Sequence, residues 1–392
     1  MTQGGFPAGS PFFAAGKERL EIRMKKVLFC ASTVSHIKNF HLPYLRAFEE
    51  RGWEVWVAAG TAEPVPFAGH VVELPFCKRL MSPRNLLAIL RARRLLKREG
   101  FDLVSAHTTL AGAVIRAAVL TMRKRPRVAY TCHGYLFSDK GVRKWIYLLP
   151  EILCARVTGT LMVMNREDRA LARKYHLCRG RLVPIPGMGF DGARFVPLPA
   201  AKRLENRREQ GFLDSEVLFI YAAEFSKRKN QRLLLEGFAK ALPEMPRAKL
   251  LLAGNGEELE NCRKFSQKLQ IENAVHFLGS VADMAALYPL CDAVVSTSRS
   301  EGLPFHLMEA MSCGLPAAVS DIKGHRELVD AGKTGFLFPS ENGDLLAKAL
   351  LELYNSPRKR AEYGKAAREK SRGFTLEAAA PKVLAAYGLL EK

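Results

Sequence analysis

The chain has 392 residues, of which 48% are hydrophobic and 25% are charged, and its formal net charge is +21. This length predicts two to three domains with cores of their own, and the composition is that of an ordinary soluble protein. No uncharged apolar run approaches the ~18 residues that a membrane-spanning helix needs, which excludes an integral membrane protein as the expected class.

The positive charge is concentrated in the first half of the chain. Residues 1–190 carry 31 Lys and Arg against 13 Asp and Glu, a net charge of +18, whereas residues 191–392 carry 29 against 26, a net charge of +3. This asymmetry predicts an anionic partner for the first half, either nucleic acid or an anionic membrane surface. Because no nucleic-acid-binding motif accompanies the charge, we favour the membrane surface and predict no nucleic-acid partner.

The amino terminus does not have the pattern of a signal peptide, because its first 16 residues carry no charge. We expect residues 1–23 to form a disordered tail, and the natural start is either Met1 or Met24, which directly precedes a strand-like run. The eight cysteines are scattered without a C-x-x-C pair. This spacing argues against a zinc site or a disulfide framework and favours reduced thiols in a cytosolic protein.

Short β-branched runs alternate with helical patterns through the first half of the chain. We expect strands at Lys25–Ser32, Trp53–Ala59, Val71–Leu74, Asp102–His107, Arg127–Cys132, Thr160–Met164 and Arg181–Ile185. We expect helices at Asn39–Arg51, Pro83–Glu99 and Leu110–Met122. This alternation predicts a doubly wound parallel sheet, whose ligands bind beyond the carboxyl ends of the strands. Three histidines, His36, His107 and His133, follow such strand ends.

Two basic segments stand out in this half. The run Arg91–Arg98 lies on the expected helix Pro83–Glu99 and is typical of a solvated helix face. In Lys140–Arg156, basic residues precede an aromatic and aliphatic cluster that begins at Trp145, which is the pattern of an interfacial membrane helix. Packing of the same apolar residues into the core is an alternative that the sequence leaves open.

A second alternating unit follows a segment rich in proline and glycine. We assign residues 24–190 to a first domain, 191–199 to a linker, 200–374 to a second domain and 375–392 to a final helical segment. Strands are expected at Val217–Ala223, Lys249–Ala253, Ala274–Leu278 and Ala293–Ser298. Helices are expected at Ala201–Gln210, Gln231–Leu242, Leu345–Tyr354, Arg358–Arg372 and Leu376–Leu389, and a further helix is opened by Gly254–Glu257 and runs to about Gln270.

The segment Ser300–Pro316, S-E-G-L-P-F-H-L-M-E-A-M-S-C-G-L-P, predicts a tight loop followed by a buried helix. Glu301 lies in the loop, and Glu309 is the only charged residue between Pro304 and Pro316. A lone buried carboxylate costs several kcal/mol unless a group such as a ligand hydroxyl hydrogen-bonds it. The free N–H groups of the first helical turn also suit a phosphate. The alternative is that Glu309 pairs with an Arg or Lys and that Glu301 is a surface loop residue.

This segment resembles the E-x7-E motif of the retaining family 4 glycosyltransferases with the GT-B fold, and the resemblance extends over roughly residues 24–390. It implies two doubly wound domains that face a cleft, with a C-terminal helix that crosses back to the first domain. It also implies that Glu301 holds hydroxyls of a donor sugar and Glu309 those of the ribose. We predict further donor contacts at Gly254, Gly302, Leu303, Pro304 and Phe305.

Family members commonly place a Gly-Arg pair at the end of the first strand of the second domain, and a Lys about five residues later, on the donor pyrophosphate. Here Glu224 stands at the Arg position, Lys229 matches the Lys, and Arg228 or Lys227 is expected to replace the missing Arg. The alternative is a solvated basic turn. We predict catalytic roles for Arg228, Lys229, Glu301 and His133.

The segments T-x-x-H-I-x-x-F-H-x-P-Y-L at residues 33–45 and Y-T-C-H-G-Y-L-F at residues 130–137 resemble the branch that builds bacterial surface polysaccharides on lipid carriers. The resemblance implies that His133 touches the donor sugar, although a histidine hydrogen-bonded within a strand–loop corner is the alternative. His36 and His107 are candidate acceptor residues. The usual glycine-rich loop after the first strand is replaced by Ser32–His36, which is a departure from the family pattern.

The expected function is transfer of a hexose or N-acetylhexosamine, with retention, from a UDP-linked sugar to a lipid-linked saccharide acceptor. The enzyme would be cytoplasmic and peripherally attached to the inner face of the cytoplasmic membrane. No D-x-D motif is present, and a helix dipole with Lys229 and Arg228 can balance a pyrophosphate, so no metal or other cofactor is expected. The alternatives are a nucleotide-sugar 2-epimerase of the same fold and a nucleic-acid-binding protein.

Overall fold

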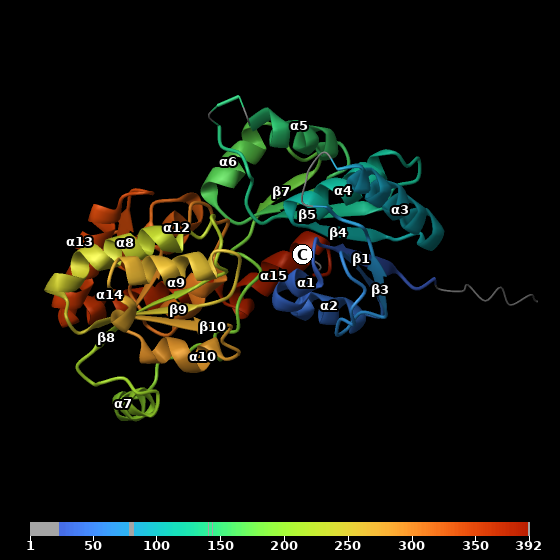
Figure 1. The fold of residues 1–392 in the computed structure, drawn as a ribbon. Coiled ribbons are helices and arrows are strands. Elements are labelled where there is room, and N and C mark those ends of the chain that lie inside the picture. Colours follow the sequence, from blue (N-terminus) through green and yellow to red (C-terminus); the bar gives the residue numbers. More distant parts are fainter. Residues whose placement is uncertain (1–22, 78–81, 140, 143, 391–392) are drawn as a thin grey trace, which may run out of the picture.

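The computed structural model describes residues 23–77, 82–139, 141–142 and 144–390. The predicted tail therefore lies outside the described residues apart from Arg23, and so do Lys140 and Arg143 of the predicted membrane segment. In the described part of the chain, two separate parallel sheets form the centres of two α/β domains (Figure 1). The prediction of two doubly wound domains is confirmed.

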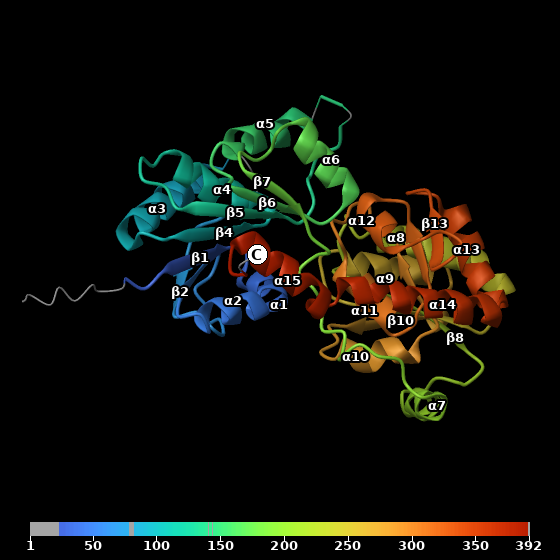
Figure 2. The same ribbon diagram turned by 180° about the vertical axis from the view of Figure 1, so that it is seen from behind.

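The first sheet has the strand order β3-β2-β1-β4-β5-β6-β7, with all neighbouring strands parallel. Its strands are β1 Lys26–Cys30, β2 Glu54–Ala59, β3 His70–Glu73, β4 Leu103–His107, β5 Arg127–Cys132, β6 Thr160–Val163 and β7 Arg181–Pro184. Helices α1 Val34–Phe40, α2 Leu42–Glu49 and α15 Leu376–Tyr387 cover one face. Helices α3 Pro83–Glu99, α4 Thr109–Leu120, α5 Lys144–Ala155 and α6 Arg166–Lys174 cover the other (Figures 1 and 2).

The second sheet has the order β10-β9-β8-β11-β12-β13, again parallel throughout. Its strands are β8 Val217–Ala222, β9 Ala248–Ala253, β10 Val275–Gly279, β11 Ala293–Ser296, β12 Ala317–Ser320 and β13 Gly335–Phe338. Helices α8 Gln231–Ala241, α9 Leu259–Lys268 and α13 Gly343–Asn355 pack on one face, and α10 Met284–Leu287, α11 Phe305–Ser312 and α14 Pro357–Ser371 on the other. Helices α7 Ala200–Glu209 and α12 Lys323–Leu328 complete the described helices of this domain.

Both sheets reverse the direction of strand addition at their first strand. The chain moves from β1 to β2 and β3 and then returns to place β4 on the other side of β1, and β8 and β11 are related in the same way. At such a switch point the loops leave the sheet in opposite directions and open a crevice for a ligand. The two switch points therefore mark where each domain presents functional residues.

The sequence prediction of one helix at Asn39–Arg51 is wrong. The structure has two helices, α1 and α2, which are separated at His41, where φ is −124° and ψ is −6°. The Thr33 side chain accepts a hydrogen bond from the His36 amide and caps the start of α1, which lies before the predicted start at Asn39. Pro43 lies in the first turn of α2, where a backbone N–H has no partner within the helix and its absence loses no hydrogen bond. This break places the His41 side chain inside the protein.

Helix α6, strand β12 and helix α12 were not predicted. Helix α6 is short and polar, so it lacks a strong apolar periodicity, although its Asn165 N-cap followed by Glu167 and Asp168 is a recognisable start signal. Strand β12 has only four residues, which follow directly after Pro316. Short elements of this kind carry too few residues for a periodicity argument.

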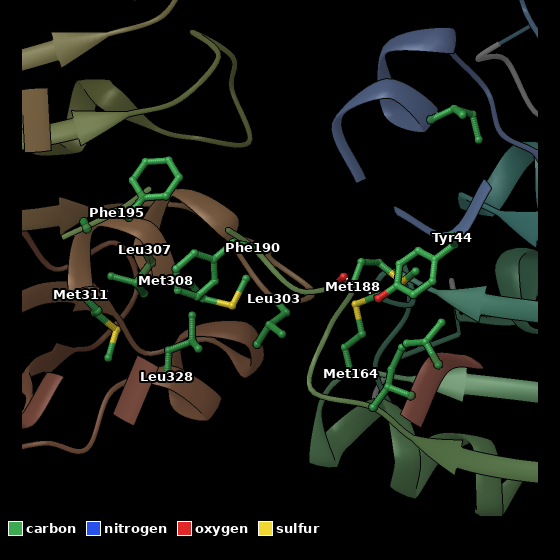
Figure 3. Packing of buried hydrophobic residues seen from close by; sticks show 14 of the residues in the cluster. Tyr44, Met164, Met188, Phe190, Phe195, Leu303, Leu307, Met308, Met311 and Leu328 are labelled. Atoms are coloured by element: carbon green, nitrogen blue, oxygen red, sulfur yellow. Dashed lines mark hydrogen bonds between the residues drawn. The ribbon is translucent and has the colours of Figure 1, made fainter. Parts of the chain in front are cut away.

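A continuous hydrophobic cluster joins the two domains (Figure 3). Met188 of the connecting segment lies beside Tyr44, whose hydroxyl donates to the Met188 carbonyl at 2.6 Å. On the second-domain side Leu303 packs against the same connection. Helix α15 returns to the first domain, where the Tyr387 ring contacts Phe48 at 5.5 Å between centroids. The predicted crossing of the C-terminal helix is thus confirmed.

Candidate active site

Lys229 and Glu301 meet at the switch point of the second sheet. Lys229 lies in the loop after β8 and Glu301 in the loop after β11, and Lys229 Nζ is 2.5 Å from Glu301 Oε1. Arg228 Nη1 lies 3.2 Å from Glu301 Oε2 and also donates to the Ser300 carbonyl at 3.0 Å. The Glu301 side chain is 10% exposed, so the alternative of a surface loop residue is wrong.

Buried hydrogen bonds fix the position of Lys229. The Tyr221 hydroxyl donates to the Lys229 carbonyl at 3.0 Å, and Thr297 Oγ1 donates to the Asn230 carbonyl at 2.8 Å. Ser298 Oγ donates to Glu301 Oε1 at 2.7 Å. Because Tyr221 lies on β8 and Thr297 and Ser298 directly follow β11, Lys229 and Glu301 are pre-organised before any ligand binds.

The electrostatic environments of the two motif carboxylates are opposite. Burial alone would raise the pKa of Glu301, but Lys229 and Arg228 outweigh it and lower that pKa to about 2. Burial raises the pKa of Glu309 to about 7, and Arg194 opposes this only in part. The two carboxylates of this motif therefore have pKa values shifted in opposite directions, and they suit different roles.

Glu309 forms no ion pair within the described part of the chain, so the alternative of a structural partnership with Arg or Lys is not supported. It lies on α11 between the buried residues Met308 and Ala310, while Arg194 is engaged with Asp283 at 2.9 Å. A partly buried carboxylate without a cationic partner has unused hydrogen-bonding capacity, which ligand hydroxyls can satisfy.

The first domain contributes a wall of histidines at its own switch point. His36 Nε2 lies 3.3 Å from His133 Nε2, and His133 Nε2 lies 3.5 Å from His107 Nδ1. The structure therefore brings together all three histidines that the sequence singled out. It adds His41, whose ring centroid is 3.8 Å from that of His107 and which the sequence analysis did not assign a role. Its occurrence five residues after His36 in the same segment was the available signal.

The loop that carries His133 and the loop that carries Glu301 contact each other at two glycines, Gly134 and Gly302. A Cβ atom on Gly302 would lie 1.8 Å from the His133 carbonyl oxygen, and one on Gly134 would lie 3.0 Å from the Gly302 Cα. A side chain at Gly302 would overlap the His133 backbone, and one at Gly134 would be strained by its φ of +123°, so the backbones of the His133 and Glu301 loops approach directly. Phe40 of α1 and Phe305 of α11 make a second contact across the domains, with ring centroids 4.5 Å apart.

The remaining predicted donor residues have structural reasons for their identity. Leu303 is buried in the shared core, and Pro304 is the N-cap residue of α11 rather than its first helical residue. Gly254 has a φ of +143°, and a Cβ there would lie 2.0 Å from the Ala223 carbonyl oxygen. Their predicted donor contacts stay predictions. Glu224, which stands where family members have Arg, is exposed.

A polar cluster between the domains was missed by the sequence analysis. Lys323 Nζ contacts Asp168 Oδ1 at 2.7 Å and donates to the Tyr135 carbonyl at 2.8 Å, and the Asp168 side chain is fully buried. Asn165 Nδ2 donates to the Gly302 carbonyl at 3.2 Å. These residues hold the Glu301 loop against the first domain. Lys323 follows a short strand that was itself not predicted, so the sequence offered little to find it.

Two cavities differ in their position relative to the motif carboxylates. One, of about 590 Å³, lies between the domains and is lined by Tyr135 and Leu136 of the first and by Ser300 and Lys323 of the second. A larger cavity, of about 990 Å³, opens at the amino-terminal edge of the first sheet. Its basic lining residues are Arg23, Lys25, Arg93, Lys97, Arg123, Lys124, Arg125 and Arg127. It lies away from the motif carboxylates.

Comparisons with known proteins agree over most of the chain. Residues 202–370 match the family described as glycosyl transferases group 1, and residues 44–188 match glycosyltransferase family 4. The putative glycosyltransferase EpsD of Bacillus subtilis is 31% identical, over 90% of this chain and 93% of the relative.

Two further similarities concern a relative with an assigned reaction and a solved structure. The UDP-Gal:alpha-D-GlcNAc-diphosphoundecaprenol alpha-1,3-galactosyltransferase of Escherichia coli is 26% identical, over 71% of this chain and 72% of the relative. The crystal structure of Anabaena HepE in complex with UDP-glucose superimposes with a TM-score of 0.73 at 21% identity, over 93% of this chain and 100% of HepE. The latter similarity shows a shared fold.

Proposed function

The chain belongs to glycosyltransferase family 4, and on this premise we propose that it transfers a hexosyl or N-acetylhexosaminyl group, with retention, from a UDP-linked sugar to a lipid-linked saccharide in surface polysaccharide biosynthesis. The observation that carries the proposal is the contrast at the second switch point. There Glu301 is held between Lys229 and Arg228, while Glu309 is partly buried without a cationic partner.

This contrast fits a nucleotide sugar. The diphosphate would lie at the amino-terminal end of α11 and share Lys229 and Arg228 with Glu301, whose freed oxygens then accept hydrogen bonds from sugar hydroxyls. Glu309 would accept hydrogen bonds from the ribose hydroxyls, because its carboxylate has no cationic partner of its own. The UDP-glucose complex of HepE, which shares the fold, supports a UDP-linked donor.

The proposed chemistry rests on charge stabilisation. As the bond from the sugar to the diphosphate breaks, negative charge grows on the leaving phosphate, where Lys229 and Arg228 are already positioned. In a front-face reaction the same phosphate accepts the proton of the attacking hydroxyl, so the product keeps the configuration of the donor. The diphosphate is proposed to need no metal ion because these two side chains and the helix dipole balance its charge.

The lipid-linked acceptor is supported by the relatives and by the cavity between the domains. The galactosyltransferase of E. coli acts, by its name, on a saccharide linked to diphosphoundecaprenol. In this chain the cavity lined by Leu136 and Ser300 leads from the outer loop before α5 to the residue preceding Glu301. His133, with His36 and His107 beside it, forms the first-domain side of the site.

An exposed apolar stripe on α5 supports attachment to a membrane surface. Trp145, Ile146, Leu149 and Leu153 are 44%, 57%, 52% and 52% exposed, so the sequence alternative in which this cluster packs into the core holds only for residues such as Leu148. None of the described helices is long and apolar enough to cross a bilayer. A basic protein with an apolar helix face of this kind is suited to lie on an anionic leaflet.

Helix α3 on the same side of the first sheet adds a second exposed patch. Leu86, Leu87 and Leu90 are exposed near its start, and the basic run Arg91–Arg98 follows along the same helix. The sequence analysis assigned this run to a solvated face. In the proposed arrangement α3 and α5 together contact the inner face of the cytoplasmic membrane.

Calorimetric titration of the full-length protein with a panel of UDP- and GDP-linked sugars tests the donor assignment. We expect one UDP-linked hexose or N-acetylhexosamine to bind most tightly and the Glu309→Gln variant to bind it more weakly. Binding of no nucleotide sugar, together with salt-sensitive binding of nucleic acid, would instead support a nucleic-acid-binding protein.

A further inference from the structure

Four histidine side chains converge on the first-domain wall of the site, from α1, from the break before α2, and from the ends of β4 and β5. One ring nitrogen from each of His36, His41 and His133 lies within 4.8 Å of the other two. Within the described part of the chain, this is the group of three that has the spacing of a metal site. His133 lies 97 residues after His36 in the sequence, so its convergence with His36 and His41 is a product of the fold.

Hydrogen bonds among these histidines cannot satisfy all of their ring nitrogen atoms. His133 Nε2 faces both His36 Nε2, at 3.3 Å, and His107 Nδ1, at 3.5 Å. A neutral imidazole nitrogen carries either one proton or one lone pair in the ring plane, and it can therefore serve only one of the two neighbours. The ring nitrogen of the other neighbouring histidine therefore makes no hydrogen bond to His133.

The His41 side chain also has ring nitrogens without hydrogen-bond partners. Its side chain is fully buried, and neither Nδ1 nor Nε2 has a hydrogen-bond partner within the described chain. A buried polar atom without a partner is destabilising, so this side chain is expected to have a partner outside the polypeptide. A bound cation supplies one, because it accepts lone pairs from several nitrogens at once.

We infer that His36, His41 and His133 bind a divalent transition-metal ion of the zinc class at the first-domain wall of the cleft. Three histidines are a common ligand set for zinc, and they leave a fourth coordination position open. His107 lies beside the set, and its orientation is fixed because His107 Nε2 is 2.8 Å from Ser105 Oγ, which is 2.7 Å from the Tyr387 hydroxyl. These hydrogen bonds fix the ring that packs against His41, with centroids 3.8 Å apart.

This inference departs from the sequence expectation that the protein binds no metal. That expectation was based on cysteine spacing and on the absence of a D-x-D motif, and neither consideration concerns a site made of histidines. The proposed ion is separate from the diphosphate position near Lys229 and does not depend on the proposed donor or acceptor. It would lie near the Glu301 loop, because the His133 carbonyl abuts Gly302.

The test uses full-length protein freed of metal by a chelator and then titrated with Co²⁺ and Zn²⁺. We expect one equivalent of Co²⁺ to bind with visible d–d absorption of tetrahedral type, and Zn²⁺ to displace it. His36→Gln and His41→Phe should each weaken Co²⁺ binding at least about tenfold. His41→Phe fills the buried volume with an apolar ring, and His36 is only partly buried, so at least one variant is expected to fold.

The matched control is His70→Gln, because His70 is an exposed histidine on β3 outside the cluster. It should bind Co²⁺ as the unaltered protein does. The inference is wrong if the unaltered protein binds no stoichiometric Co²⁺ or Zn²⁺. It is also wrong if folded His36→Gln and His41→Phe bind the ion as tightly as the unaltered protein, since binding would then occur elsewhere.

Discussion

The Lys229 ammonium group lies 2.5 Å from the Glu301 carboxylate, at the switch point of the second sheet and within a largely buried environment. The ion pair joins the loops after β8 and β11, which are about seventy residues apart in sequence. It keeps a cation at the amino-terminal side of α11 before any donor arrives. The pair thereby positions both the group that would stabilise a leaving phosphate and the group that would hold the sugar.

Replacement of Lys229 by alanine should lower kcat more than donor affinity. The positive charge matters most when negative charge grows on the leaving diphosphate, and the loss of one such group costs on the order of 10²-fold in kcat. Steady-state kinetics of Lys229→Ala measure this effect. Lys264→Ala is the control, because Lys264 is exposed on α9 of the same domain and lies outside the loop after β8, and it should retain nearly full kcat. Equal effects of the two variants would contradict a specific role for Lys229.

Replacement of Glu309 by glutamine should weaken donor binding by about 1.5–3 kcal/mol, the range for hydrogen bonds to a charged group. Because the pKa of Glu309 in the folded protein is about 7, its carboxylate forms as pH rises through neutrality. Donor affinity of the unaltered protein should therefore increase between pH 6 and pH 8. Calorimetry at both pH values checks this, and the Glu309→Gln variant should lose that part of the increase. Unchanged affinity in the variant would show that Glu309 does not bind the donor.

The same substitution should stabilise the protein without donor at alkaline pH. The folded-state pKa of Glu309 is raised from 4.5 to about 7, so between these values the unfolded chain releases a proton that the folded chain keeps. The contribution of Glu309 to the free energy of unfolding is thus highest below about pH 4.5 and falls as pH rises to 7. Glu309→Gln should gain about 1–3 kcal/mol at pH 8 and little at pH 5. Urea unfolding at the two pH values measures the difference, and an equal effect at both would contradict the raised pKa.

The exposed stripe on α5 should mediate membrane binding. Replacement of Trp145, Ile146 and Leu149 by serine removes apolar contact area while leaving the exposed surface well solvated. We expect weaker co-sedimentation with vesicles that contain anionic lipid, and unchanged donor affinity. Leu213→Ser is the control, because Leu213 is an apolar residue of the second domain that is 64% exposed. Binding of the unaltered protein should also fall as salt rises, since basic residues add ~1 kcal/mol each near an anionic leaflet. Binding that ignores lipid charge and the α5 residues would argue against this surface.

The contact between Lys323 and Asp168 should couple the two domains. Lys323→Ala leaves the buried Asp168 carboxylate without its cation, which typically costs about 3–5 kcal/mol. We expect a lower thermal midpoint and, in small-angle scattering, a larger radius of gyration if the domains separate. Lys333→Ala is the control, since Lys333 is exposed in the same domain. A variant with unchanged stability would show that the interdomain ion pair is dispensable.

The sequence predicted the fold well because strand and helix periods are local properties. The helix Pro83–Glu99 and the strand Arg127–Cys132 were predicted with their observed bounds. The site was only partly predictable. Glu301, Glu309 and Lys229 lie in motifs that can be recognised in one segment, but Lys323, Asp168 and His41 acquire their roles from contacts between distant segments. No periodicity or composition reports such contacts.

Transfer of sugar to a lipid-linked acceptor tests the central claim most directly. The purified full-length protein would be incubated with the UDP-linked sugar that binds best and a saccharide acceptor linked to a lipid diphosphate in anionic vesicles. Mass spectrometry would follow both substrates, and NMR would give the anomeric configuration of the product. We predict that the sugar reaches the acceptor with the configuration it had in the donor, and that the donor persists when the acceptor is left out. Conversion of the nucleotide sugar to an epimer without any acceptor would contradict the account and indicate a 2-epimerase.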